Sequence, residues 1–200
     1  IGLWNLTRLA ECLLHLIDED VGRAIEIAKD RLEGFIHSYQ HHWLTGMRDK
    51  IGLNTESDRD KVLIEDLLTL MANQHVDFTQ TFYQLSLLSR DVTNDDAVLA
   101  LFDHADAFVQ WLDQWRKRLQ QEGSDDQERK ASMRQVNPLY IPRNHLIESA
   151  IRAAENQGDF SVFHALHDVL RQPFDYQPGR DTNMQPPQPD EIVHQTFCGT

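Results

Sequence analysis

Residues 6–17 read Leu-Thr-Arg-Leu-Ala-Glu-Cys-Leu-Leu-His-Leu-Ile. Their apolar side chains recur every three or four residues, the spacing that places them on one face of an α-helix. The same period returns along most of the chain, which shows no βαβ alternation and no Asn-Gly hairpin signal. The sequence therefore predicts an all-α fold with about eight helices. The apolar positions of this first stripe are Leu6, Leu9, Ala10, Leu13, Leu14 and Ile17.

Capping residues and glycines divide the rest of the chain into further expected helices. Asp77 is expected to cap one helix at its N-terminus and Gly158 to end another, because these positions favour a carboxylate and a glycine respectively. A break is expected at Gly22, between the first helix and the second. The expected segments after the first are 23–42, a short turn at 43–50, helices opened by Ser57, Asp77 and 93–96, and helices at 103–121, 126–135, 145–156 and 160–170.

Prolines mark where helical structure is expected to stop. Residues 137–142 contain two prolines four positions apart, which disfavour a helix interior and predict an extended connector. The five remaining prolines all fall near the C-terminus, where regular helix is equally disfavoured. We therefore expect a helical region at 1–171 and an extended proline-rich tail at 172–200, which ends in Cys-Gly-Thr.

The composition is that of a folded protein with a strongly acidic surface. The 200 residues include 19 lysines and arginines against 32 aspartates and glutamates, for a formal net charge of −13. This charge repels phosphate backbones, so nucleic acid is not an expected partner. The apolar runs are far shorter than the ~20 residues that span a bilayer, so a membrane is not expected either. Because the chain starts at Ile1 with no methionine or signal sequence, we expect that it belongs to a larger protein.

Two pairs of histidines share a helical face by their spacing, as a metal site on a helix requires. His37 and His41 are four residues apart, but the segment lacks the glutamate of the HExxH zinc motif. His164 and His167 are three apart, but the paired Glu-x-x-His motifs of di-metal sites are missing. For the first pair, a polar helix end close to Trp43 is the favoured interpretation. No metal ligand is therefore predicted.

Nucleotide-binding and catalytic motifs are missing from the sequence. It contains no GxGxxG, GxxxxGK[ST] or GxSxG motif and no kinase HRD or DFG element. Trp111 and Trp115, four residues apart, are expected in the core or at an interface. The basic run 116–118 beside them is expected to be a solvated helix end, which a partner could also contact.

The two cysteines do not form a disulfide framework, and they indicate free thiols in a reducing compartment. Cys12 falls on the first helix, where we expect it to be buried as a small hydrophobe. Cys198 stands third from the C-terminus, where a thiol on a mobile tip is exposed and can reach another thiol. From the residues alone, an inert thiol is the simpler interpretation of Cys198.

Three blocks of the sequence resemble the selenoprotein O family, whose members are similar to protein kinases in fold. Residues 1–11, IGLWNLTRLAE, are similar to that family's WNL-x-RLA helix. Residues 137–145, NPLYIPRNH, are similar to its NP-x-Y-x-x-RN connector. The segment from GDF at 158–160 to RQPFDYQP at 171–178 is similar to its GD…LR-x-PFDEQP stretch. Cys198 matches the C-terminal cysteine or selenocysteine of the family.

The resemblance implies the C-terminal part of a protein adenylyltransferase, which transfers AMP from ATP to serine, threonine or tyrosine hydroxyls of other proteins. The nucleotide, catalytic and metal-binding residues of the family lie upstream, so none is expected in this chain. The full-length protein is expected to use ATP with Mg or Mn, to act on protein substrates in the cytoplasm, and to provide an N-terminal catalytic domain as a partner of this region. Cys198 is implied to be a redox residue that pairs with an upstream cysteine.

A stand-alone helical interaction module is the alternative interpretation. In that case the apolar face of Leu6, Leu13 and Ile17 binds a partner, or Trp111 and Trp115 do so. Under the adenylyltransferase interpretation, the same face of the first helix is expected to be exposed for lack of its neighbouring domain.

Overall fold

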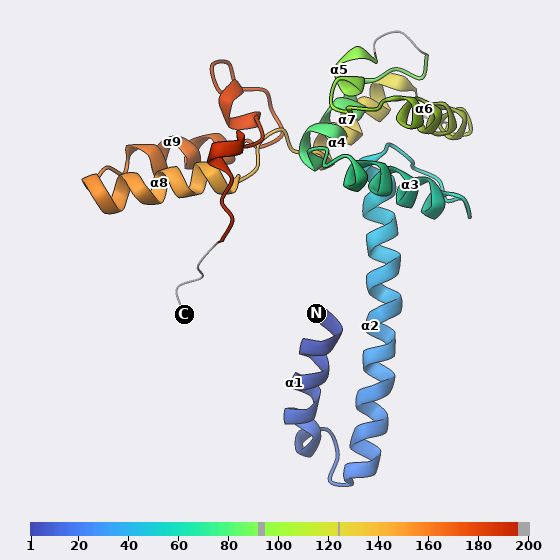
Figure 1. The fold of residues 1–200 in the computed structure, drawn as a ribbon. Helices are drawn as coiled ribbons and strands as arrows, with labels where there is room; N and C mark the ends of the chain where they lie inside the picture. Colours follow the sequence, from blue (N-terminus) through green and yellow to red (C-terminus); the bar gives the residue numbers. More distant parts are fainter. Residues whose placement is uncertain (92–94, 124, 196–200) are drawn as a thin grey trace. The chain divides into compact units, whose positions relative to one another are not determined.

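The computed structural model describes residues 1–91, 95–123 and 125–195, and within these ranges it contains α-helices, two short 3₁₀ helices and no strand (Figure 1). The all-α class is therefore confirmed. The chain forms two compact units, residues 1–47 and 48–200. Part of the cap expected at 93–96 lies outside the described residues. The elements are α1 (Gly2–Ile17), α2 (Val21–Lys50), α3 (Asp60–Asn73), α4 (Phe78–Leu87), α5 (Asp96–Leu99), α6 (Asp106–Leu119), α7 (Asp126–Val136), α8 (Asn144–Gln157), α9 (Ser161–Leu170), η1 (Asp181–Met184) and η2 (Pro189–Glu191).

Helix α1 in the first unit buries none of its side chains. Its apolar stripe is partly open, since Leu9 is 54% and Leu13 is 38% exposed, whereas the other four members, Leu6, Ala10, Leu14 and Ile17, are half-buried. Cys12 is also exposed, so the expectation of a buried thiol was wrong. The reason is that the whole helix lacks a covering layer, and its amphipathic pattern alone does not bury any position.

The expected break between the first two helices lies at 18–20, just before Gly22, but the separate turn expected at 43–50 was wrong because α2 is continuous through it. Gly22 and Gly46 both lie inside it. An isolated glycine in a helix costs only about 1 kcal/mol relative to alanine, and no proline interrupts the segment. Although α2 is 30 residues long, none of the described helices is both long and apolar enough to cross a lipid bilayer.

A ladder of stacked aromatic rings forms the centre of the second unit. Phe108 stacks on Phe102 at 4.0 Å and on Trp111 at 5.6 Å between ring centroids. Trp111 in turn stacks on Trp115 at 6.0 Å. The indole N–H of Trp111 donates to the Leu63 carbonyl, so the ring ties α6 to α3. Both tryptophans are buried, as expected for core residues, and they form no surface for a partner.

A buried ionic cluster joins the end of α6 to the start of α3. The Arg118 guanidinium donates to Asp60 at 2.8 Å and also to Glu122, and all three side chains are at most 8% exposed. Glu122 in turn accepts hydrogen bonds from the backbone N–H and the hydroxyl of Thr55. Arg48 at the end of α2 lies 3.2 Å from Asp60. Each of these buried charges therefore has an opposite charge beside it, as burial requires, although the Nε atom of Arg48 makes no hydrogen bond.

The solvated helix end expected at 116–118 is instead largely buried. Arg116 forms a bidentate pair with Asp95, at 2.8 and 2.6 Å, and it is 5% exposed. Arg118 enters the ionic cluster on the other side of the helix. Asp95 and Asp60, which hold these arginines, lie 21 and 58 residues away, and only Glu122 is a near neighbour in the sequence, four residues after Arg118.

The turn that follows α2 requires glycine at position 52. Gly52 has φ of +74°, a conformation that other residues rarely adopt. A Cβ atom at this position would lie 2.7 Å from the Met133 sulfur and 2.8 Å from the Cγ of Arg129. Arg129 itself is buried over the Trp115 ring and donates to the Leu88 carbonyl. The turn at Gly52 therefore packs closely against α7, whose Arg129 lies over Trp115 of the aromatic ladder.

Replacing Arg118 with methionine is expected to lower the free energy of unfolding by about 3–5 kcal/mol, because Glu122 would remain buried without a cation and Asp60 would keep only Arg48. The matched control is Arg152→Met, which removes an i,i+4 pair with Glu148 that is open to solvent. That change is expected to cost less than about 1 kcal/mol. Urea denaturation of the two variants measures the difference, and equal losses would contradict a structural role for the cluster.

The carboxyl of Glu122 makes the stability of the second unit dependent on pH. Burial acts to raise the pKa of Glu122, but hydrogen bonds from Thr55, Arg118 and the Asn54 N–H outweigh burial and hold the pKa below its ordinary value. The stabilisation is therefore complete above the unfolded pKa of about 4.3 and is lost as the pH falls through the lower folded value.

Glu122→Gln is thus expected to be less stable than the parent chain at pH 7, with a gap that narrows as the pH falls below about 4.3. Urea denaturation across this pH range measures the gap. Glu148→Gln, which removes a more exposed carboxylate, is the control. Its stability is expected to differ little from that of the parent chain, both at pH 7 and at the lower pH values. If the stability difference between Glu122→Gln and the parent chain does not change with pH, this carboxylate is excluded as a source of the pH dependence.

Candidate functional site

Two of the sequence blocks quoted above meet at a junction that fixes the start of the C-terminal tail. The backbone N–H groups of Leu139 and Tyr140 both donate to the Pro173 carbonyl, at 2.7 and 3.0 Å. The Tyr140 hydroxyl accepts a hydrogen bond of 3.0 Å from the backbone N–H of Gln177. The connector at 137–142 and the tail after α9 are therefore joined side by side by their backbones.

Side chains complete this junction. The Gln177 amide nitrogen donates to the carbonyls of Val169 and Gln172, which lie at the end of α9. Leu139, Tyr140 and Val169 form a buried apolar cluster, and Tyr140 is only 1% exposed. The tail thus turns back from α9 over a small core of its own, which explains why a tyrosine and a glutamine occupy these positions.

An ion pair holds the tail at a second point, further along the chain. Asp77 caps α4 as expected, since its carboxylate accepts the Gln80 N–H at 2.8 Å. Arg143 pairs with the same carboxylate at 2.7 Å and donates through its other nitrogen to the Met184 carbonyl at 2.8 Å. The Gln80 side chain donates to that carbonyl as well. The backbone of the tail is therefore anchored at Met184 to both α4 and the start of α8.

The Asp77 carboxyl is electrostatically suited to this role. Burial acts to raise the pKa of Asp77, but the hydrogen bonds from Arg143 and from the Gln80 N–H outweigh burial and lower the pKa below its ordinary value. The carboxylate therefore stays charged at neutral pH and keeps Arg143 oriented toward the tail.

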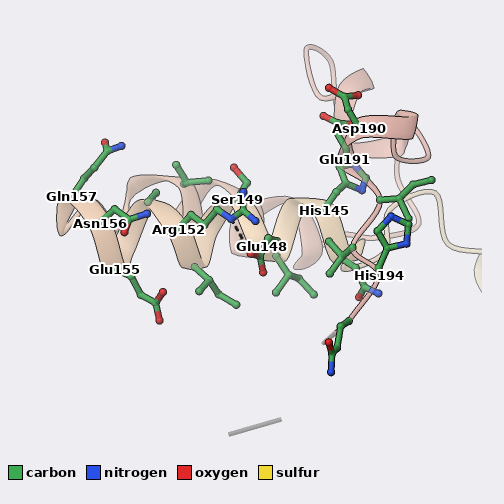
Figure 2. A pocket seen from close by; sticks show the side chains of 18 of the residues that line it. His145, Glu148, Ser149, Arg152, Glu155, Asn156, Gln157, Asp190, Glu191 and His194 are labelled. Atoms are coloured by element: carbon green, nitrogen blue, oxygen red, sulfur yellow. Dashed lines mark hydrogen bonds and ion pairs between the residues drawn. The ribbon is translucent and has the colours of Figure 1, made fainter. Parts of the chain in front are cut away.

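Beyond Met184 the tail borders an open groove of about 1310 Å³ along α8 (Figure 2). The groove is lined along the length of α8, from Asn144 to Gln157, and by tail residues 190–195. Figure 2 shows Asp190, Glu191 and His194 of the tail at the end of α8 that carries His145. Gly158 closes α8 in the left-handed conformation, as expected, with φ of +65°.

The structure places the candidate metal ligands on the exposed surfaces of two helices. His37 and His41 lie on α2 in the first unit, and both are exposed on the helix rather than at its end. His164 and His167 lie exposed on α9. Within the described residues, no three histidine, cysteine, aspartate or glutamate side chains are grouped as a metal site. Cys198 lies outside the described residues.

The roles of Arg143 and Asp77 had no local signal in the sequence, because the two are 66 residues apart. Tyr140, Arg143 and Gln177 belong to the motifs that carried the family resemblance. Those motifs indicated that the residues matter together, but only the structure shows that they bind one another and the tail.

Tyr140→Phe removes the hydroxyl that accepts the Gln177 N–H and leaves the ring in place. We expect amide hydrogen exchange at Gln177 to accelerate at least about fivefold, since a lost hydrogen bond of this kind is worth about 1 kcal/mol. Tyr176→Phe, which removes an exposed hydroxyl bonded to Asp181, is the control and is expected to leave Gln177 unchanged. Unchanged exchange in Tyr140→Phe would show that this hydroxyl does not anchor the tail.

Comparison with known proteins assigns the chain to a family. The family described as "Protein adenylyltransferase SelO" matches residues 1–171. Proteins named "Protein nucleotidyltransferase YdiU" from Rhizobium meliloti (strain 1021), Rhizobium leguminosarum bv. trifolii (strain WSM2304) and Rhodopseudomonas palustris (strain BisB5) are each 48% identical to it over all 200 residues. The chain spans 41%, 40% and 41% of their lengths, respectively. The chain therefore belongs to the SelO family of nucleotidyltransferases.

Proposed function

We propose that this chain is the C-terminal region of a protein adenylyltransferase, which transfers AMP from ATP to hydroxyl groups of serine, threonine or tyrosine in other proteins. The observation that carries the proposal is the family match over residues 1–171, together with relatives named as protein nucleotidyltransferases. Because the chain spans about 40% of the length of these relatives, the activity belongs to the whole protein and not to this region alone.

The site of chemistry lies in the remainder of the protein under this proposal. The family's glycine-rich loop, nucleotide-binding lysine, catalytic aspartate and metal-binding residues are upstream of the WNL block, which here begins the chain. The whole protein uses ATP with Mg or Mn, and the present region supplies no ligand to either. Its own contribution is to hold the tail at the Tyr140 and Arg143 contacts.

The proposed role of the anchored tail is to carry a regulatory thiol, Cys198. Cys198 follows the anchored segment and occupies the position of the family's C-terminal cysteine or selenocysteine. In this proposal it forms a disulfide with a cysteine near the active site, as two thiols lose two protons and two electrons to an oxidant such as a small-molecule disulfide. Anchors at Gln177 and Met184 support this role because they limit where the end of the chain can reach.

A protein-interaction module remains the second candidate, favoured by the exposed face of α1. Leu9 is 54% exposed and Leu13 is 38% exposed on that helix. Exposed apolar stripes of this kind mark contact surfaces. The alternative surface at Trp111 and Trp115 is excluded, because those side chains are 2% and 0% exposed in the core.

The assay that separates the two candidates uses ATP labelled on its α-phosphate, a divalent metal and a mixture of protein acceptors. The intact protein is expected to transfer the label to protein, because AMP retains that phosphate. Residues 1–200 alone are expected to transfer none. Label transfer by residues 1–200 alone would place the active site inside this region, and no transfer by the intact protein would favour the interaction module.

A further inference from the structure

The groove along α8 has the surface of a peptide-binding site. Helix α8 has 14 residues, and so its length is about 21 Å. An extended polypeptide advances about 3.3 Å per residue, so the groove accommodates about six residues. This size fits a short segment of a partner protein better than it fits a whole domain face.

The charge of the groove is strongly one-sided. Five carboxylates line it, against a single arginine and no lysine. That arginine, Arg152, already pairs with Glu148 at 2.8 Å on the same helix. The remaining four carboxylates therefore leave a net negative potential that attracts lysine and arginine and repels acidic or phosphorylated ligands. These four are Glu155, Asp159, Asp190 and Glu191.

Apolar side chains lie between these charges. Ile151 of α8 is 46% exposed and Ile192 of the tail is 47% exposed, and both line the groove. Ile147, Val162 and Val193, which are half-buried, line it as well. A partner that matches this surface has apolar side chains on the face turned toward the groove and basic side chains beside them.

One of the residues that line the groove carries a buried polar atom without a partner. The Nδ1 atom of His145 is buried and has no hydrogen-bond partner among the residues that the structure describes. His145 lines the groove at the end of α8 where the tail residues lie (Figure 2).

We propose that this groove binds a short extended segment of protein substrates, about six residues long, in which basic and apolar side chains alternate. The inference rests on the proposed function for the identity of the partner as a substrate. It adds a recruitment surface to that function. The groove recognises the segment by charge and by apolar contact, and the hydroxyl that accepts AMP lies elsewhere in the substrate.

The binding test uses a fluorescein-labelled peptide, Lys-Ile-Arg-Leu-Lys-Val, and the intact protein without nucleotide. Fluorescence anisotropy is expected to show binding that weakens with added salt. The double reversal Glu155→Lys with Asp190→Lys is expected to weaken binding at least about tenfold. The control reversal, Asp66→Lys with Asp113→Lys, alters two exposed carboxylates outside the groove and is expected to change binding less than about twofold.

Three binding results would overturn the inference. The first is equal binding of Glu-Ile-Asp-Leu-Glu-Val, which keeps the apolar pattern and reverses the charge. The second is equal loss of binding in the two reversals. The third is binding by residues 1–200 alone but not by the intact protein, which would show that another segment of the same protein fills the groove.

A transfer assay separates this inference from the proposed function. Carrier proteins with and without the basic hexapeptide are offered to the intact protein with labelled ATP. The hexapeptide is expected to lower KM for the carrier in the parent protein but not in the Glu155→Lys, Asp190→Lys variant. Equal transfer to both carriers would overturn the recruitment role. Peptide binding without transfer to any protein would contradict the proposed function and leave the groove as a binding site.

Discussion

The buried guanidinium of Arg118 is the interaction on which the second unit most depends. It lets Asp60 and Glu122 stay charged in the interior, and these carboxylates in turn hold the start of α3 and the turn after α2. A charge in this position is costly unless each of its hydrogen bonds is made. The cluster therefore fixes the order of α2, α3 and α6 around the aromatic ladder more strictly than apolar packing alone would.

A buried arginine paired with a carboxylate also holds the tail, in a smaller arrangement than the Arg118 cluster. Arg143 is a buried cation that a carboxylate holds, and its remaining nitrogen binds a backbone carbonyl of the tail. Tyr140 supplies the apolar contact and one further hydrogen bond. The result is an ordered path from α9 to Met184, followed by the segment that borders the acidic groove. Within the tail, the anchored residues Gln177 and Met184 therefore precede the residues 190–195 that border the groove, and Cys198 follows them in the sequence.

Local features of the sequence predicted the local features of the structure. The helical period, the Asp77 cap and the Gly158 terminator depend on neighbouring residues, and all three were correct. The basic run at 116–118 was misjudged, since Asp95 and Asp60, which bind its arginines, lie 21 and 58 residues away along the chain. Cys12 was misjudged because a stripe predicts which face of a helix is apolar and not whether anything covers it. The motifs that contain Tyr140 and Gln177 pointed to the candidate site, but their contact required the fold.

The central claim is that this region supports a nucleotidyltransferase whose nucleotide site lies in the rest of the protein. Photo-crosslinking of the intact protein with an azido derivative of ATP, followed by mass spectrometry of the labelled peptides, tests it most directly. The account predicts labelled peptides from outside these 200 residues and none from within them. Specific labelling inside residues 1–200, abolished by unlabelled ATP, would contradict it.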